Sequence, residues 1–275
     1  MVAPGLDGGM CGIGLGAMTS RWKTLDAVIF SSLGAAAIAA GLVFAAAAPM
    51  DAGRPWRAAA LAFAGTLVVY NIDRLLNLER GRQLCPERTA YVDQHRAGLT
   101  ALCAGGGAAA AKLILETNPA IWVLCGAILA VGLFRHRLTR FPFLKPLYLT
   151  LAWVAITVGL PALCAQEPQR VAWIVLVFAG ALGANVAARG VEGTSRLELG
   201  EFAHGTLRRA GGLALGAAAV ALAGPIELRP LAWIPLAELA AIFGFRPGER
   251  YALLVLDGAL FAGALPAIVV TLTGG

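Results

Sequence analysis

Residues 69–96 read VYNIDRLLNLERGRQLCPERTAYVDQHR, and they begin where an uncharged apolar run, residues 58–69, ends. Acids, amides and arginines follow within a few helical turns: Asn71, Asp73, Arg74, Asn77, Glu79, Arg80, Arg82, Glu87 and Arg88. Carboxylates are hard oxygen ligands that hold Mg²⁺ against a substrate phosphate, and arginine donates to phosphate oxygens through a planar fork. On a helix, Asp73 and Asn77 share a face. The stretch therefore predicts either a membrane-surface site for a metal ion and a phosphate group, or a charged, solvated loop.

The composition around this stretch is that of a membrane protein. Hydrophobic residues make up 59% of the 275, charged residues only 14%, and the mean hydropathy is +0.74. Soluble chains carry roughly 25% charged residues. The apolar runs repeatedly approach the ~20 residues that a transmembrane helix needs, and no long polar linker separates them. We therefore expect an all-α polytopic membrane protein that forms one bundle.

Nine apolar segments are predicted to span the membrane. They cover residues 25–47, 57–77, 97–115, 119–134, 146–165, 170–188, 206–224, 229–245 and 250–272. With nine spans, most of the 22 basic residues fall on one side, as they do in cytoplasmic loops. This places the N-terminus in the cytoplasm and the protein in a plasma membrane of the bacterial inner-membrane type. The net charge of +6 then reflects orientation and does not indicate a nucleic-acid partner.

The ends and the cysteines add two expectations. Residues 1–23 are glycine-rich and are predicted to be a flexible tail, with Met18 as an alternative start and residues 24–275 as the transmembrane domain. The five cysteines show no ligand spacing, so free thiols are expected, with no disulfide framework or zinc site.

An internal echo joins the two halves of the chain. FAGTLVVYN (63–71) ends the second apolar segment and FAGALGAN (178–185) ends the sixth, and a charged loop follows each. Repeats of this kind place a shared site between the halves of membrane proteins.

These features resemble the UbiA superfamily of intramembrane prenyltransferases. Three stretches carry the resemblance: YNIDRLLNLERGR with PERTA (70–90), FPFLKPLYLTLAW (141–153) and NVAARGVEG (185–193). In that family two acidic motifs bind Mg²⁺ ions that hold the diphosphate of an isoprenoid donor, and a hydrophobic acceptor attacks the donor carbon. The resemblance implies a Mg²⁺ site at Asp73, Asn77 and Glu79, with Lys145 as a further catalytic residue. It implies that the diphosphate contacts, besides Lys145, are Asn71, Arg74, Arg88, Tyr148, Asn185 and Glu192.

The second motif departs from the family pattern. Ala187, Gly190 and Thr194 stand where aspartates are expected, and Glu192 is the carboxylate that remains nearby. Two functions therefore stay open. One is transfer of an isoprenoid group from its diphosphate to an aromatic or lipid-like acceptor. The other is a non-catalytic family member that binds a prenyl lipid or acts as a membrane scaffold.

Ionisable and aromatic residues inside the predicted helices complete the set of candidates. Asp257 lies two turns inside the ninth segment and Glu238 lies in the eighth, and such residues are candidate functional sites by default. Trp153, in the fifth segment, is a candidate for lining a prenyl cavity. A small-molecule transporter built from inverted repeats is the third, less favoured interpretation, because the charges gather at one surface.

Overall fold

The computed structural model describes residues 26–79, 86–138, 144–191, 201–246 and 248–273, and in these ranges all regular structure is helical. The longer helices are α2 (Leu33–Ala47), α3 (Pro55–Leu76), α5 (Pro86–Gln94), α6 (Arg96–Leu115), α7 (Pro119–Leu138), α8 (Leu144–Thr157), α10 (Val171–Arg189), α11 (Glu201–Ala223), α12 (Trp233–Phe243) and α14 (Asp257–Thr273). Short helical pieces connect them: η1 (Ala48–Met50), α9 (Gly159–Ala162), η2 (Pro168–Arg170), η3 (Ile226–Ala232), α13 (Glu249–Tyr251) and η4 (Ala252–Leu256). The predicted tail, residues 1–23, lies outside the described residues together with Met18.

Helices occupy all nine segments predicted to be apolar spans. Five of them are long and apolar enough to cross a membrane by length and composition: α2 with η1, α3, α6, η2 with α10, and η4 with most of α14. Pro119–Val131 of α7 and Leu144–Thr157 of α8 are shorter apolar helices. The structure thus confirms an all-helical chain with several membrane-spanning candidates, and the count of nine spans stays a prediction.

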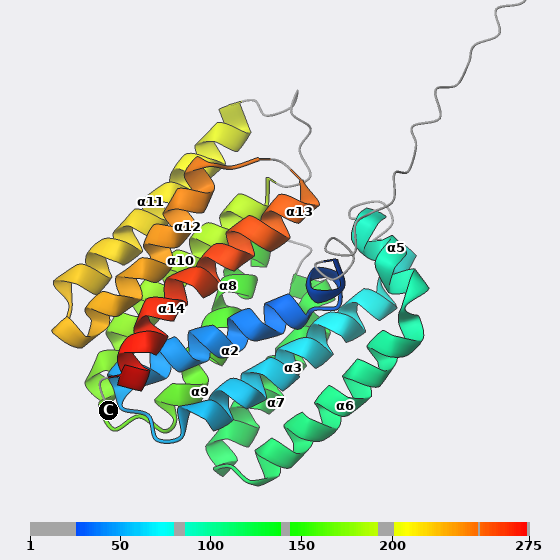
Figure 1. Ribbon diagram of the computed structural model, residues 1–275, viewed down its shortest axis with the longest axis horizontal. Helices are drawn as coiled ribbons and strands as arrows, with labels where there is room; N and C mark the ends of the chain where they lie inside the picture. Colours follow the sequence, from blue (N-terminus) through cyan, green and yellow to red (C-terminus); the bar gives the residue numbers. More distant parts are fainter. Residues whose placement is uncertain (1–25, 80–85, 139–143, 192–200, 247, 274–275) are drawn as a thin grey trace, which may run out of the picture.

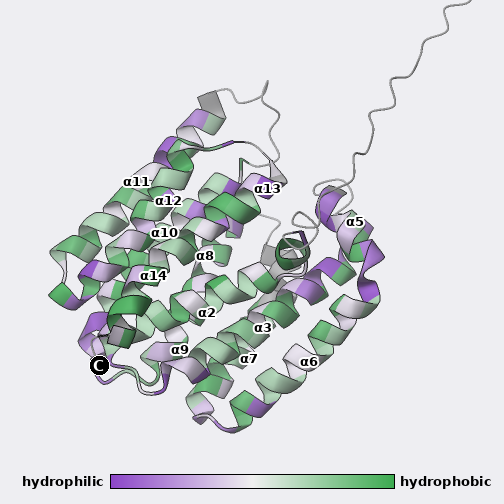
Figure 2. Cartoon of the chain, viewed as in Figure 1, coloured by the Kyte–Doolittle hydropathy of each residue, from purple (hydrophilic) through white to green (hydrophobic). Residues whose placement is uncertain are grey.

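The helices form one bundle, in which α2 joins two groups (Figure 1). On one side α2 packs against α3, which packs against α6 at the edge of the bundle. On the other side α2 contacts α14, which is followed by α12, α11 and α10, and α8 contacts both α2 and α10. Hydrophobic residues cover most of the helix surfaces, and hydrophilic residues gather on α5 and near helix ends (Figure 2). Exposed leucines, valines and aromatic residues on these surfaces are what a lipid-facing bundle requires.

The first predicted segment is interrupted. Residues 26–30 are helical, Ser31 and Ser32 form a turn, and α2 begins at Leu33. Ser32 has a φ of 66°, which is in the left-handed region that residues other than glycine rarely adopt. Both serines are buried. A polar backbone break inside an apolar bundle is tolerated only where other groups satisfy it, so its partners on α3 become important for the site.

Two further interruptions lie in the last two predicted segments. In the eighth, η3 is a 3₁₀ helix that contains Pro230, and α12 begins only at Trp233. In the ninth, η4 is a π-helix of five residues that ends where α14 begins, at Asp257. π-helical turns are uncommon and are often found at functional sites, which directs attention to Asp257.

Small residues let the helices approach closely in the core. A Cβ on Gly263 of α14 would lie 2.5 Å from the Cα of Ile234 and 2.5 Å from the carbonyl oxygen of Trp233, both on α12. A Cβ on Gly180 of α10 would lie 2.7 Å from that of Ala217 on α11. Because backbones can meet this closely only where a side chain is missing, these glycines set the spacing of the second group of helices.

Arg250 ties three segments together at the end of the bundle that carries α5. Its Nε lies 2.7 Å from Glu87 Oε2 on α5, and its Nη2 lies 3.6 Å from Asp26 Oδ2 in the first helical turn. Asp26 is buried, whereas Arg250 and Glu87 are partly exposed. Asp26, at the start of the first helical turn, thus links this turn to Arg250.

Candidate functional site

Polar side chains near the C-terminal end of α3 form hydrogen bonds with the turn that interrupts the first predicted segment. Asn71 is fully buried; its Oδ1 accepts a hydrogen bond of 3.0 Å from Ser32 Oγ, and its Nδ2 donates one of 2.9 Å to the carbonyl oxygen of Ser31. One turn later, Arg74 donates to the carbonyl oxygen of Phe30. Asn71 and Arg74 were predicted to contact a diphosphate. In the structure Asn71 uses its amide within the protein, and Arg74 is half-buried beside it.

Asp73 and Asn77 meet as their spacing on the helix predicts. Asn77 Nδ2 donates a hydrogen bond of 2.6 Å to Asp73 Oδ1 and also reaches the Asp73 carbonyl oxygen at 2.9 Å. Both side chains are half-buried, while Glu79 follows the end of α3 and is exposed. Among the described residues, no three histidine, cysteine, aspartate or glutamate side chains gather into a group that could hold a metal. One carboxylate with one amide is still a set that suits Mg²⁺ when substrate phosphates supply further oxygens.

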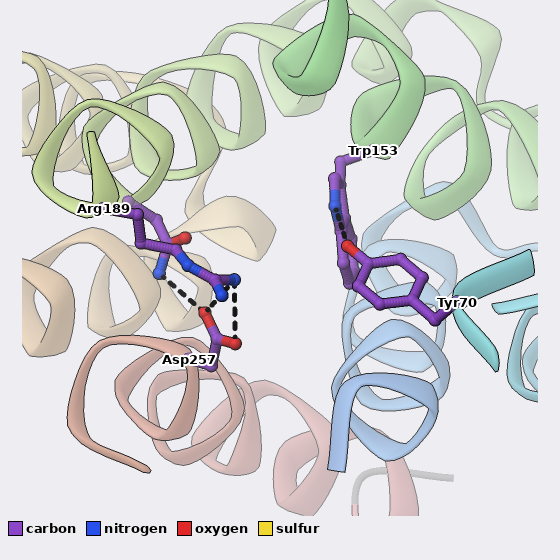
Figure 3. A network of polar contacts seen from close by, with 5 residues as sticks. Tyr70, Trp153, Arg189 and Asp257 are labelled. Atoms are coloured by element: carbon purple, nitrogen blue, oxygen red, sulfur yellow. Dashed lines mark hydrogen bonds and ion pairs between the residues drawn. The ribbon is translucent and has the colours of Figure 1, made fainter. Parts of the chain in front are cut away.

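A second polar cluster joins α10 and α14. Arg189 Nη1 lies 3.1 Å from Asp257 Oδ2 and 3.2 Å from its Oδ1, and Asn185 Nδ2 lies 3.4 Å from Oδ1 (Figure 3). Asn185 and Asp257 are buried, and the Arg189 side chain is 25% exposed. The sequence indicated Asn185 and Asp257 as candidates and missed Arg189, although it stands one helical turn after Asn185.

Glu238 of α12 adds a second carboxyl to this cluster. It is fully buried, and neither Oε1 nor Oε2 has a hydrogen-bond partner among the described residues. It interacts electrostatically with Asp257 and Arg189. A carboxyl in this state is expensive inside a membrane protein.

Two aromatic side chains face the second cluster across the interior of the bundle. Trp153 Nε1 on α8 donates a hydrogen bond of 3.1 Å to the Tyr70 hydroxyl on α3, and the rings meet edge to face with centroids 6.2 Å apart. Figure 3 shows this pair opposite Arg189 and Asp257. Tyr70 interacts electrostatically with Arg189, Asp257 and Arg74. Trp153 was a predicted cavity residue, and Tyr70, part of the quoted stretch, was not singled out.

The two clusters are built alike, which gives the sequence echo a structural counterpart. Asn71 and Arg74 share one face of α3 and hold the turn at Ser31 and Ser32. Asn185 and Arg189 share one face of α10 and hold Asp257, at the end of the π-helical turn. In each half, an asparagine and an arginine about one turn apart therefore bond to a neighbouring helix: in the first to the turn at Ser31 and Ser32 and to the Phe30 carbonyl oxygen, in the second to the carboxylate of Asp257.

An apolar groove of ≈ 480 Å³ lies between α3 and α6. It is lined by Phe63, Ala64, Leu67, Gly98, Ala101, Leu102, Gly105, Gly106 and Ala109. At a helical repeat of 3.6 residues, Phe63, Leu67, Tyr70 and Arg74 fall on one face of α3. Two groove residues, Phe63 and Leu67, are therefore followed along the same face of α3 by Tyr70 and Arg74. We call this face the α3 stripe. A second hollow of ≈ 180 Å³ lies elsewhere, between the starts of α3 and α7 and the end of α9.

Comparisons of the chain with protein-family models, with curated proteins and with solved structures give no significant match.

The remaining predicted site residues lie on α5, on α8 or outside the described part of the chain. Arg88 on α5 and Tyr148 on α8 are half-buried, and each already has an interaction partner. Lys145, in the first turn of α8, is exposed. Glu192 lies outside the described residues. The structure therefore pairs Asp73 with Asn77, holds Asn71 and Arg74 against the first segment, and separately joins Asn185 to Asp257.

Proposed function

We propose that the chain is a UbiA-like membrane prenyltransferase with nine spans, which moves an isoprenoid group from its diphosphate to an aromatic or lipid-like acceptor. The observation that supports it most is the α3 stripe, where Phe63 and Leu67, which line the apolar groove, are followed along the helix by Tyr70 and Arg74. An isoprenoid diphosphate has the same order of chemistry, with a long apolar tail, an allylic carbon and an anionic head.

The diphosphate of the donor would bind at the polar end of the α3 stripe, near Arg74. Arg74 and Arg189 offer guanidinium groups that bind phosphate oxygens, and both interact electrostatically with the interior around Tyr70. Asp73 and Asn77 provide one carboxylate and one amide oxygen for Mg²⁺, which would offset the charge of the leaving diphosphate. Glu79, Lys145, Arg88 and Tyr148 belong to the proposed cytoplasmic rim of this site.

In the proposed reaction, the Tyr70–Trp153 pair lies near the allylic carbon on which positive charge develops. As the allylic carbon–oxygen bond breaks, its electron pair leaves with the diphosphate, and positive charge develops on the carbon. The Tyr70 and Trp153 rings meet edge to face in the interior, so they can stabilise that charge over a ring face. The acceptor then forms the new bond to this carbon and loses a proton. The site therefore supplies electrostatic stabilisation at both ends of the breaking bond.

The test is release of diphosphate by the purified chain in lipid nanodiscs, with and without Mg²⁺. Geranyl, farnesyl and geranylgeranyl diphosphates would be offered with a set of phenolic and lipid acceptors. We expect Mg²⁺-dependent release, at least tenfold slower in Asp73→Ala and in Arg74→Ala. Glu116→Gln, at an exposed position after α6, is the matched control and should behave as the wild type. Activity that is equal in Asp73→Ala would show that the site is placed wrongly.

A prenyl-lipid-binding protein without catalysis is the second candidate. It is favoured by Asn185 and Arg189, which stand near the place of the second acidic motif and are engaged with Asp257. In that case the wild type should bind a fluorescent prenyl diphosphate or prenyl alcohol saturably, without Mg²⁺ and without release of diphosphate.

A further inference from the structure

The hollow of ≈ 180 Å³ lies at the end of the bundle away from α5 and takes no part in the proposed prenyl transfer (Figure 1). Its wall comes from the connection between α2 and α3, the connection between α6 and α7, and the end of α9. Arg57 in the first turn of α3 and Arg74 in the last are 17 residues apart, which is about 25 Å along a helix. The hollow is therefore separate from the polar end of the α3 stripe.

Positive charge gathers in this hollow. Arg54 and Arg57 both line it, and within the described part of the chain neither forms an ion pair. The Arg57 Nε is buried and has no hydrogen-bond partner there. Glu116 is the one acid that lines the hollow, and its side chain is exposed. By contrast, Arg170, which contacts the end of α2, is paired with Glu227 at 3.0 Å.

The start of α3 adds to the same charge. Helices usually begin with a serine, threonine, aspartate or asparagine whose side chain accepts from the first turn, and acids are favoured there. α3 has Arg54 at this position, with a φ of 57°, no side-chain cap and no acid in its first turn. α7, which begins in the wall of the same hollow, follows the usual rule, because Asn118 Oδ1 accepts from the Ala120 N–H at 2.9 Å. Two cations thus stand at the start of α3, where local chemistry favours an anion.

The surroundings of the hollow suit the head group of a lipid. Trp56 and Trp122, each next to a residue that lines the hollow, are exposed. Exposed tryptophans at the ends of apolar helices are typical of the membrane–water interface, which is where lipid phosphates lie. Leu61, Ile121 and Leu160 also line the hollow. Its volume is below the roughly 300–1,000 Å³ of pockets for drug-sized ligands, so a head group would fit with its acyl chains outside.

We propose that the hollow binds one phosphate group, held by Arg54 and Arg57 at the uncapped start of α3. Guanidinium groups form charge-assisted hydrogen bonds to phosphate oxygens, and a helix N-terminus favours the same negative charge. Two sources share this chemistry, an anionic phospholipid of the membrane and a free phosphate ion. The bound group would join α3, α7 and the end of α9, and its binding does not depend on prenyl transfer.

Cys164 provides the measurement, because it lines the hollow and is exposed. A bound phosphate group should shield its thiol from N-ethylmaleimide in the full chain in mild detergent. Peptide mass spectrometry would follow modification of Cys164, with Cys103 on α6, outside the hollow, as the internal reference. Dioleoylphosphatidylglycerol should slow the modification of Cys164 saturably, by at least about fivefold. Dioleoylglycerol, which has the same chains and no phosphate, should not.

Sodium phosphate, compared with sodium chloride at equal ionic strength, distinguishes the two sources. Protection by sodium phosphate as well as by the phospholipid would assign the site to the phosphate group alone. Protection by the phospholipid only would assign it to the whole head group. Either result supports the proposal.

Four variants test the assigned residues. Arg54→Gln and Arg57→Gln should each weaken the protection by about tenfold. Arg229→Gln removes an exposed arginine on η3 that does not line the hollow, and it should behave as the wild type. Glu116→Gln removes the negative charge from the wall and should strengthen binding. Misfolding does not raise affinity, so this variant tests the site even where an arginine variant folds poorly.

Three outcomes would overturn the proposal. The first is that neither phosphatidylglycerol nor sodium phosphate protects Cys164 in the wild type. The second is equal protection by dioleoylglycerol, which would show that acyl chains alone cover the thiol. The third is unchanged protection when Arg54 and Arg57 are both replaced by glutamine.

Discussion

Nη1 of Arg189 on α10 lies 3.1 and 3.2 Å from the two carboxylate oxygens of Asp257 on α14. The contact joins two helices that are 68 residues apart at this point in the chain. It is mostly buried, since the side chains are 25% and 12% exposed. Removing one partner of this ion pair would therefore leave the other charged group with little access to water.

Arg189→Ala is expected to destabilise the protein by about 3–5 kcal/mol, because the buried Asp257 carboxylate loses the partner of its ion pair. Asp257→Ala should have a similar cost, and the double variant should cost less than the two single costs added together. Chemical denaturation in mild detergent measures all three. Arg96→Ala is the control, since Arg96 pairs with Asp93 at 3.0 Å where both side chains are exposed, and the change should cost at most about 1 kcal/mol. Strict additivity of the two buried changes would contradict the pairing.

Asn71→Ala should loosen the turn between residues 26–30 and α2. The change removes the acceptor of Ser32 Oγ and the donor to the Ser31 carbonyl oxygen, both fully inside the bundle. Leaving such groups unsatisfied costs about 1–3 kcal/mol each. Hydrogen exchange in residues 26–36 would report the effect, with residues of α11 as an internal reference that should not change.

Gly263→Ala is expected to disrupt the packing of α14 on α12. The added Cβ would meet backbone atoms of Trp233 and Ile234 at 2.5 Å, and backbone cannot rotate away as a side chain can. Overpacking of this kind costs about 1–3 kcal/mol or more. Gly258→Ala on the same helix is the matched control, because a Cβ there meets nothing within 4 Å. The two alanines should differ in Tm by several degrees, with Gly258→Ala close to the wild type.

Under the proposed function, Gly105→Leu should shorten the isoprenoid chain that can bind. Gly105 lines the groove between α3 and α6, and an added Cβ there has open space around it. The larger side chain would fill the groove without unfolding the helix. Binding of geranylgeranyl diphosphate should fall at least tenfold and that of geranyl diphosphate much less, as measured by competition with a fluorescent analogue. Gly107→Leu, two residues along the same helix but outside the residues that line the groove, should leave both unchanged.

The sequence predicted the helices well because their signal is local. Long apolar runs separated by charged loops allow few structures other than membrane helices, and a helix lies at each predicted segment. The pairing of Asp73 with Asn77 also follows from spacing within one helix. The interruption of the first segment was not predicted, since the turn at Ser31 and Ser32 depends on Asn71, some 40 positions away.

The second cluster shows most clearly what a single sequence leaves out. Asn185, Glu238 and Asp257 come from three helices, so their contact depends on how the bundle packs. Arg189 and Tyr70 lack an individual signal, because an arginine at a helix end and a tyrosine in an apolar run have ordinary explanations. The phrases FAGTLVVYN and FAGALGAN each end at an asparagine, and in the structure Asn71 bonds to the turn at Ser31 and Ser32 whereas Asn185 bonds to Asp257.

The contacts of Arg250 make the attachment of α5 sensitive to dissolved electrolyte. Its pair with Glu87 lies near water, where mobile ions screen charges over about 10 Å at 0.1 M salt. The clusters around Asn71 and Asp257 are buried and are screened much less. Concentrated salt should therefore weaken the contact between Arg250 and α5 before it disturbs the interior, while the apolar contacts of α5, such as that of Tyr91 with Phe30, remain.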